Sequence, residues 1–113
     1  MSNQEPSLTV EETHGGLARE RFVAPANTLL KVASRSRPAA IAGAVAGVIR
    51  SGATATIQAV GAGAVNQAVK AIAIAHSYLQ DDGIAITCMP SFLEVSIDDQ
   101  ERTAICLLVE RRP

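Results

Sequence analysis

The side chains best suited to chemistry follow a two-glycine turn between a strand-like and a helix-like segment. Gly61 and Gly63 lie in V-G-A-G-A-V, and Asn66, Gln67 and Lys70 follow over the next turns of the helix. Glycine tolerates the dihedral angles of a sharp turn, and the free N–H groups at a helix N-terminus attract anions. The pattern therefore indicates either an anion-binding site or a tight structural turn.

The turn lacks two features of a dinucleotide-binding site, which argues against such a site. The fingerprint for such a site needs a third glycine where this chain has Asn66, and an acidic residue at the end of the next strand. The chain has neither of these features. We therefore expect no bound cofactor.

A second set of candidate residues is basic. Arg35 and Arg37 precede the first expected helix, and Lys70 lies in the second. The formal net charge is −1, but no acidic residue occurs between Arg21 and Asp81, and acids dominate after that point. This distribution predicts one basic face and one acidic edge. Lysine and arginine side chains hold a phosphate backbone without reading its sequence, although each residue alone is also typical of a solvated surface.

Enzymatic and metal chemistry have little support, since no acid, base and nucleophile converge. Cys88 and Cys106 lie in apolar runs and are interpreted as reduced core thiols of a cytoplasmic protein, without histidines at zinc-like spacing. Asp98, Asp99 and Glu101 are interpreted as a turn. We expect a non-enzymatic protein without a metal, a signal peptide or a membrane span.

Hydrophobic periodicity predicts an α/β (α+β) two-layer domain over residues 28–113, after a disordered or loosely attached extension at 1–27. The expected order is β-α-β-α-β-β, a four-stranded mixed sheet with two helices on one face. Strands are predicted at 28–34, 53–60, 84–97 with a break at Pro90-Ser91, and 103–110, and helices at 37–51 and 63–79.

Three local features refine this prediction. Ser36 is the expected N-cap of the first helix. Val69 and Tyr78 belong to the expected buried stripe of the second helix. Gly43 and Gly47 lie four residues apart in the first helix, where glycine costs about 1 kcal/mol against alanine. They indicate the close approach of a sheet, a helix or a partner subunit.

Longer motifs resemble a known family. The segments L-K-V-A-S-R-S-R-P-A-A-I-A-G, G-A-G-A-V-N-Q-A-V-K-A-I-A, M-P-S-F and E-R-T-A-I-C-L-L-V-E are similar to the stage V sporulation protein S family of bacteria. The resemblance runs from about Leu30 to Arg111 and leaves out the first 27 residues. It implies a regulatory role in sporulation or a related developmental process.

That family is similar in layout to the Alba superfamily of small nucleic-acid-binding proteins. The resemblance implies a homodimer whose basic loops and hairpin arm bind DNA or RNA. Carried over by position, the binding residues are Arg35, Arg37, Gly61, Gly63, Asn66, Gln67 and Lys70. The hairpin turn D-D-Q-E departs from a basic arm, and an acidic arm is repelled by phosphate. Either the arm has another task, or binding is weak and confined to one face.

Three hypotheses remain from the sequence. The first is a cytoplasmic dimer that binds DNA or RNA without sequence specificity. The second is a self-assembling scaffold or protein adaptor, with subunit contacts through the Gly43 and Gly47 face and the hairpin. The third is a sensor of a small anionic ligand or nucleotide at the Gly61–Gly63 turn.

Overall fold

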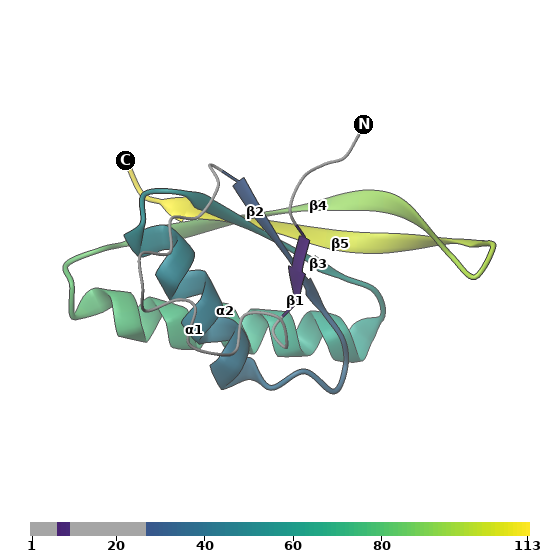
Figure 1. The fold of residues 1–113 in the computed structure, drawn as a ribbon, viewed down its shortest axis with the longest axis horizontal. Helices are drawn as coiled ribbons and strands as arrows, with labels where there is room; N and C mark the ends of the chain where they lie inside the picture. The colour runs from purple at the N-terminus through teal and green to yellow at the C-terminus, as the bar shows by residue number, and fades with distance from the viewer. Residues whose placement is uncertain (1–6, 10–26) are drawn as a thin grey trace.

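The computed structural model describes residues 7–9 and 27–113 (Figure 1). It contains two helices and five strands in this part of the chain. They are β1 (Ser7–Thr9), β2 (Asn27–Val32), α1 (Pro38–Arg50), β3 (Thr54–Ala59), α2 (Ala62–Gln80), β4 (Ile86–Ile97) and β5 (Gln100–Arg111). The predicted order β-α-β-α-β-β is confirmed from β2 onward.

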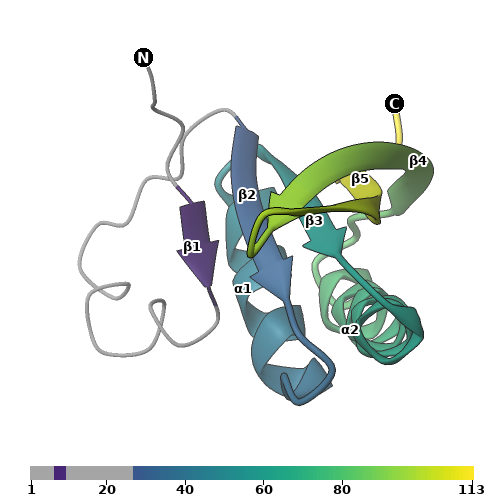
Figure 2. The ribbon, with the colours of Figure 1, turned by 90° about the vertical axis from the view of Figure 1, so that its right-hand side faces the viewer.

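The strands form one mixed sheet in the order β1-β2-β3-β5-β4. β2 pairs with β3 in parallel, whereas β5 is antiparallel to both β3 and β4. Both helices cover the same face of the sheet (Figures 1 and 2). This confirms the predicted four-stranded mixed sheet with two helices on one face. The short β1 adds a parallel edge to β2, and it lies within the predicted extension, whose residues 1–6 and 10–26 are outside the described part.

The core is built from small aliphatic side chains. Alternation along β3 turns Ala55, Ile57 and Ala59 toward the helices, where all three are buried. Ile41 and Ile49 of α1 belong to the same core cluster as these strand residues, and both are completely buried. No aromatic residue of the described part belongs to this cluster. The layers therefore depend on close approach of backbones, because large rings are not available to fill gaps.

The predicted buried stripe of α2 is partly wrong. Its buried positions are Ala64, Ala68, Ala71, Ala75 and Leu79. Val69 is 52% exposed and Tyr78 is 40% exposed. The alanines form the contact stripe because small residues let α2 lie close to α1 and the sheet. The larger side chains are consequently turned toward solvent.

β4 and β5 form a long hairpin that extends beyond the body of the domain (Figure 1). β4 continues through Pro90, where the sequence predicted a break. Proline is accepted here because β4 is an edge strand, whose outward side needs no N–H donor. The pairing of β5 with β3 stops at Ile105, so residues 100–104 pair only with β4.

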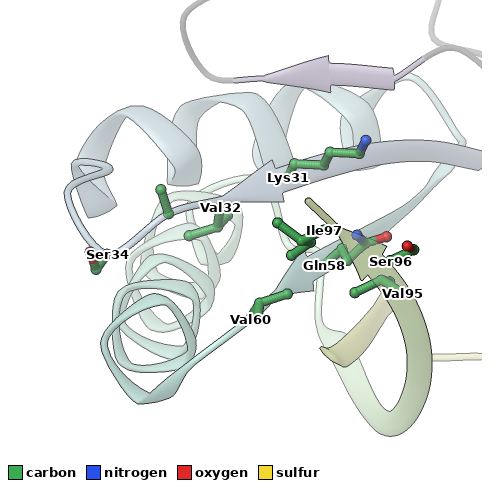
Figure 3. Close-up of a pocket in the computed structure, with 9 residues that line it drawn as sticks. Lys31, Val32, Ser34, Gln58, Val60, Val95, Ser96 and Ile97 are labelled. Carbon is green, nitrogen blue, oxygen red and sulfur yellow. The ribbon is translucent and has the colours of Figure 1, made fainter. Parts of the chain in front are cut away.

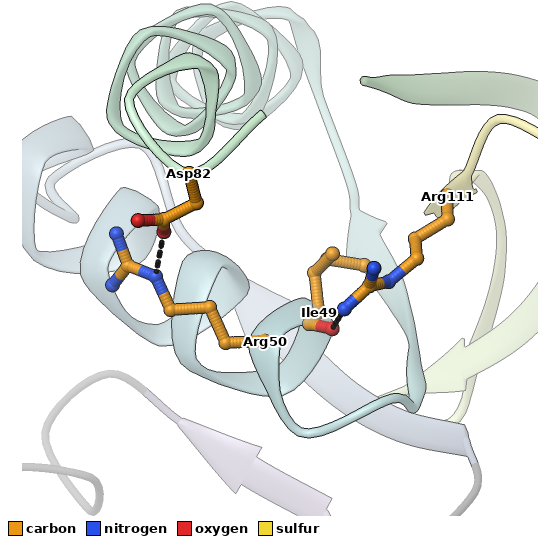
Figure 4. Close-up of polar contacts among 4 residues, drawn as sticks. All are labelled: Ile49, Arg50, Asp82 and Arg111. Carbon is orange, nitrogen blue, oxygen red and sulfur yellow. Dashed lines mark hydrogen bonds and ion pairs between the residues drawn. The ribbon is translucent and has the colours of Figure 1, made fainter. Parts of the chain in front are cut away.

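At the end of the sheet away from the hairpin tip, polar contacts join the C-terminal end of α1 to the ends of α2 and β5 (Figure 4). Arg50, at the end of α1, forms an ion pair of 2.7 Å with Asp82, just after α2. Arg111 Nη2 donates a hydrogen bond of 3.4 Å to the carbonyl oxygen of Ile49. Both members of the ion pair are substantially exposed, so it contributes at most about 1 kcal/mol.

The hairpin turn predicts an unusual stabilising substitution. Asp98 and Asp99 form a two-residue turn with φ values of 52° and 65°. Both residues are in the left-handed region, as a type I′ turn requires, and glycine has no steric penalty there. We expect Asp99→Gly to raise the free energy of unfolding by about 1 kcal/mol in urea denaturation. Glu101→Gly, which removes the same charge from a strand, should destabilise the protein instead.

Candidate nucleic-acid interface

Two loops that carry predicted site residues lie side by side at one end of the sheet. β2 and β3 are parallel, with Val32 opposite Ala59, so both strands end at the same edge. The loop of residues 33–37 leaves β2 there, and the turn at Gly61 leaves β3. The fold therefore brings Arg35 and Arg37 close to the start of α2.

Each glycine of the turn has a structural task. Gly61 is the N-cap of α2 with φ 94° and ψ 155°, a conformation that is essentially restricted to glycine. A Cβ atom on Gly63 would lie only 2.9 Å from the Cβ of Ser34. The missing side chain of Gly63 thus allows the 33–37 loop to contact the first turn of α2. The tight structural turn, one of the two interpretations of the sequence, accounts for both glycines.

Gln67 fixes the same loop from the next turn of α2. Its Nε2 atom donates a hydrogen bond of 2.8 Å to the carbonyl oxygen of Ser36. Within the loop, the Ser36 hydroxyl accepts a hydrogen bond of 3.0 Å from the N–H of Ala33. The predicted N-cap of α1 is wrong: the helix begins after Arg37 rather than Ser36, and no side-chain hydrogen bond caps it. Ser36 stabilises the loop rather than the helix start.

The cations of this end are available to a ligand. Arg35, Arg37 and Lys70 are all exposed, and no ion pair involving them occurs within the described part of the chain. Lys70 lies three residues beyond Gln67, so it continues along α2 on the side that contacts the loop. Asn66 is exposed one turn before Lys70. Of the predicted site residues, only Gln67 has its side-chain amide committed to an internal contact.

Acidic side chains also lie at this end. The hairpin curves over β3 toward β2 (Figure 2). Ile97 and Ser34 line the same cavity, and they directly precede Asp98 and Arg35 in the chain. The loop that carries Arg35 and the hairpin turn that carries Asp98 therefore lie at the same end of the molecule. A phosphate chain here is attracted by the loop cations and repelled by the carboxylates of the hairpin tip.

The two cysteines are not a buried pair. Both are free, and Cys88 is exposed on β4, so the prediction of a core position for it is wrong. Cys106 is half-buried on β5. Partial desolvation raises the pKa of both thiols. They therefore hold their protons at neutral pH and are poor nucleophiles.

Two polar residues near the loops were not among the predicted site residues. Lys31 and Gln58 are opposite each other on β2 and β3, on the sheet face that the helices leave open. Both line the cavity beneath the hairpin. Alternation along each strand assigns them to one face, but the sequence does not show that the hairpin covers that face.

The fold and this end of the sheet define a small α+β two-layer domain with exposed cations on a loop and on the adjacent helix. A family model described as stage V sporulation protein S (SpoVS) matches residues 28–112, which covers all of the domain except its last residue. The chain belongs to this family. Across residues 7–9 and 27–113, the structure has no helix with the length and apolar character that crossing a bilayer requires, and no group of side chains suited to a metal ion.

The Gly63 contact leads to a prediction with an internal control. Gly63→Ala places a methyl group where Ser34 must move, so we expect a loss of about 1–3 kcal/mol in the free energy of unfolding and a displaced 33–37 loop. Gly43→Ala has open space around its new Cβ, within a helix, and should stabilise by up to about 1 kcal/mol. Urea denaturation measures both changes. Equal effects of the two substitutions would contradict a packing task for Gly63.

Proposed function

We propose that this protein is a non-enzymatic, cytoplasmic, homodimeric regulator that binds nucleic acid through the end of the sheet where β2 and β3 finish. The observation that carries the proposal is a set of exposed cations on a loop and a helix that are held in contact. These cations are Arg35, Arg37 and Lys70. The Gln67 contact to Ser36 and the Gly63 contact to Ser34 hold this surface in place. A fixed array of cations loses less conformational entropy when it binds a polyanion.

The chemistry of this surface suits phosphate rather than base sequence. Arginine offers a planar fork of donors that matches a phosphate oxygen pair, and lysine adds a point charge. Asn66 is free to donate to a phosphate or a sugar. The binding therefore draws on the backbone of DNA or RNA, and it weakens as salt rises because phosphate contacts release counterions.

Charge reversal tests this interface. We expect Arg35→Glu with Lys70→Glu to weaken binding of short DNA and RNA by about 10–100-fold at low salt. The slope of log K against log salt should fall by about 2, which is one unit for each lost phosphate contact. Fluorescence anisotropy over a salt series measures both quantities.

A matched control lies at the other end of the sheet. Arg112 is exposed after β5, and Arg112→Glu makes the same charge change as Arg35→Glu far from the loops. It should leave the affinity within about twofold once long-range screening is complete at 0.15 M salt. Equal losses for Arg35→Glu and Arg112→Glu would contradict a local interface.

The dimer is supported by the edge strand. β4 is a twelve-residue edge strand that displays Phe92 at 78% exposure and Met89 at 65% exposure. Long apolar edges are normally covered, because they invite pairing with other chains. A second copy of this chain that packs against the Phe92 face of β4 would cover this aromatic side chain. It would also double the number of cationic loops presented to one polymer.

The oligomeric state tests this arrangement. The chain mass is 11.8 kDa, and we expect light scattering to give twice that value at micromolar concentration. Phe92→Glu should raise the dimer Kd by about 30-fold or more, as for a buried aromatic anchor. Gly43→Glu, on the exposed face of α1, should leave it unchanged. Dissociation by Gly43→Glu instead would favour the scaffold that assembles through the glycine face.

The wider role is proposed from the family. Its description as stage V sporulation protein S supports a part in sporulation or a related developmental programme. The resemblance of the layout to Alba proteins agrees with nucleic acid as the partner. The alternative of a nucleotide sensor at the Gly61–Gly63 turn has less support, because the positive φ of Gly61 and the Ser34 contact of Gly63 already explain both glycines.

A further inference from the structure

A cavity of about 690 Å³ lies between the end of the sheet and the distal half of the hairpin (Figure 3). We call it the hairpin pocket. Its floor comes from the ends of β2 and β3, and its outer wall comes from the last residues of β4. It is lined by Lys31, Val32, Ala33, Ser34, Gln58, Val60, Val95, Ser96 and Ile97. The volume falls within the range of about 300–1,000 Å³ that is typical of small-molecule sites.

The register explains why these side chains converge. Gln58 pairs with Cys106, which pairs with Ser91, so all three lie on the open face of the sheet. Val95 and Ile97 lie on that same face, four and six residues beyond Ser91. The curvature of the hairpin then turns them back over β3, where they face Gln58 (Figure 3).

The lining combines aliphatic walls with unused hydrogen-bonding groups. Val60, Val95 and Ile97 form the apolar part. Within the described part of the chain, the side-chain amide of Gln58 and the amine of Lys31 make no hydrogen bond to another protein group. An amide offers one donor and one acceptor side by side, as does the edge of a nucleobase. A flat base with apolar faces and a polar edge therefore matches the pocket.

The charges at the mouth favour a single strand over a duplex. Arg35 follows Ser34 on one side of the mouth, and Asp98 follows Ile97 on the other. Double-stranded DNA carries phosphates on two strands, one charge per 1.7 Å or so of axis, and would meet the hairpin carboxylates. A single strand can keep its phosphates on the arginine side. Its unpaired bases are also free to leave the stack and enter a cavity.

We propose that the hairpin pocket binds one unpaired base of a single-stranded nucleic acid whose backbone lies on Arg35 and Arg37. This inference rests on the proposed function and specifies the form of nucleic acid. The pocket is large enough for purines and pyrimidines alike, so it selects for an unpaired strand without requiring a sequence. Lys31 lines the β2 side of the pocket, and its amine extends along the strand toward β1 (Figure 3).

The test compares the same sequence as a single strand and as a duplex, at equal salt, by fluorescence anisotropy. We expect the wild-type protein to bind the single strand at least about tenfold more tightly. Gln58→Leu, which keeps the size of the side chain but removes its polar atoms, should reduce the single-strand affinity about tenfold, as the loss of a base contact does. Duplex affinity should stay unchanged. Gln80→Leu, at an exposed position at the end of α2, is the matched control.

Two further measurements separate a base contact from a change in folding. Ile97→Glu places a carboxylate on the pocket wall and should lower single-strand affinity without changing the circular dichroism spectrum. A strand in which every base is replaced by an abasic site should bind the wild-type protein less tightly than the intact strand, whatever the register of binding. Gln58→Leu should bind the two strands with nearly equal affinity, whereas a change of folding alone would leave the difference between them in place.

Several results of these binding measurements would overturn the hairpin pocket. Equal affinity for single strand and duplex, or a preference that survives Gln58→Leu and Ile97→Glu, would overturn the hairpin pocket and leave the loop interface intact. Equal losses of single-strand and duplex binding would also overturn it, because the pocket residues would then act without regard to base pairing. The absence of binding to any oligonucleotide at low salt would overturn the proposed function, and the pocket with it.

Discussion

The arrangement of this end of the molecule depends on one missing side chain. Gly63 has no Cβ atom, and a Cβ there would lie 2.9 Å from that of Ser34. The loop that carries Arg35 and Arg37 can therefore lie directly on the first turn of α2. The hydrogen bond from Gln67 to Ser36 then fixes the position. Without the close approach of Ser34 to Gly63, the two loops would still leave the same sheet edge, but the 33–37 loop would lie farther from α2.

Much of the fold follows from local pattern. Alternation along β3 and the three- and four-residue spacing in α1 predict the elements and their order correctly, because burial on one face determines both patterns. Val69 and Tyr78 were wrongly assigned to the buried stripe of α2 because alanine and the larger apolar residues give the same periodicity, and only packing decides which of them is buried. The continuous β4 was missed because Pro90 is harmless only on an edge strand, and strand order is not a local property.

The candidate site likewise contains residues whose positions follow from the sequence and residues whose positions do not. The positions of Arg35 and Arg37 in a loop and of Lys70 on the adjacent helix follow from the element order, since parallel strands end together. The task of Gln67 could not be predicted, because its partner Ser36 lies 31 residues away. The pocket around Gln58 was likewise hidden. It depends on the bending of a hairpin whose residues lie more than thirty positions further along the chain.

The overhang of the hairpin has a mechanical consequence. Residues 93–97 and 100–104 form a ribbon of only two strands, since β3 supports β5 no further than Ile105. Such ribbons have little stability of their own and twist more readily than wide sheets. The pocket thus combines a stiff floor, anchored in the core, with a compliant wall. Bending of the ribbon beyond Ile105 therefore changes the width of the pocket more readily than it changes the packed layers beneath.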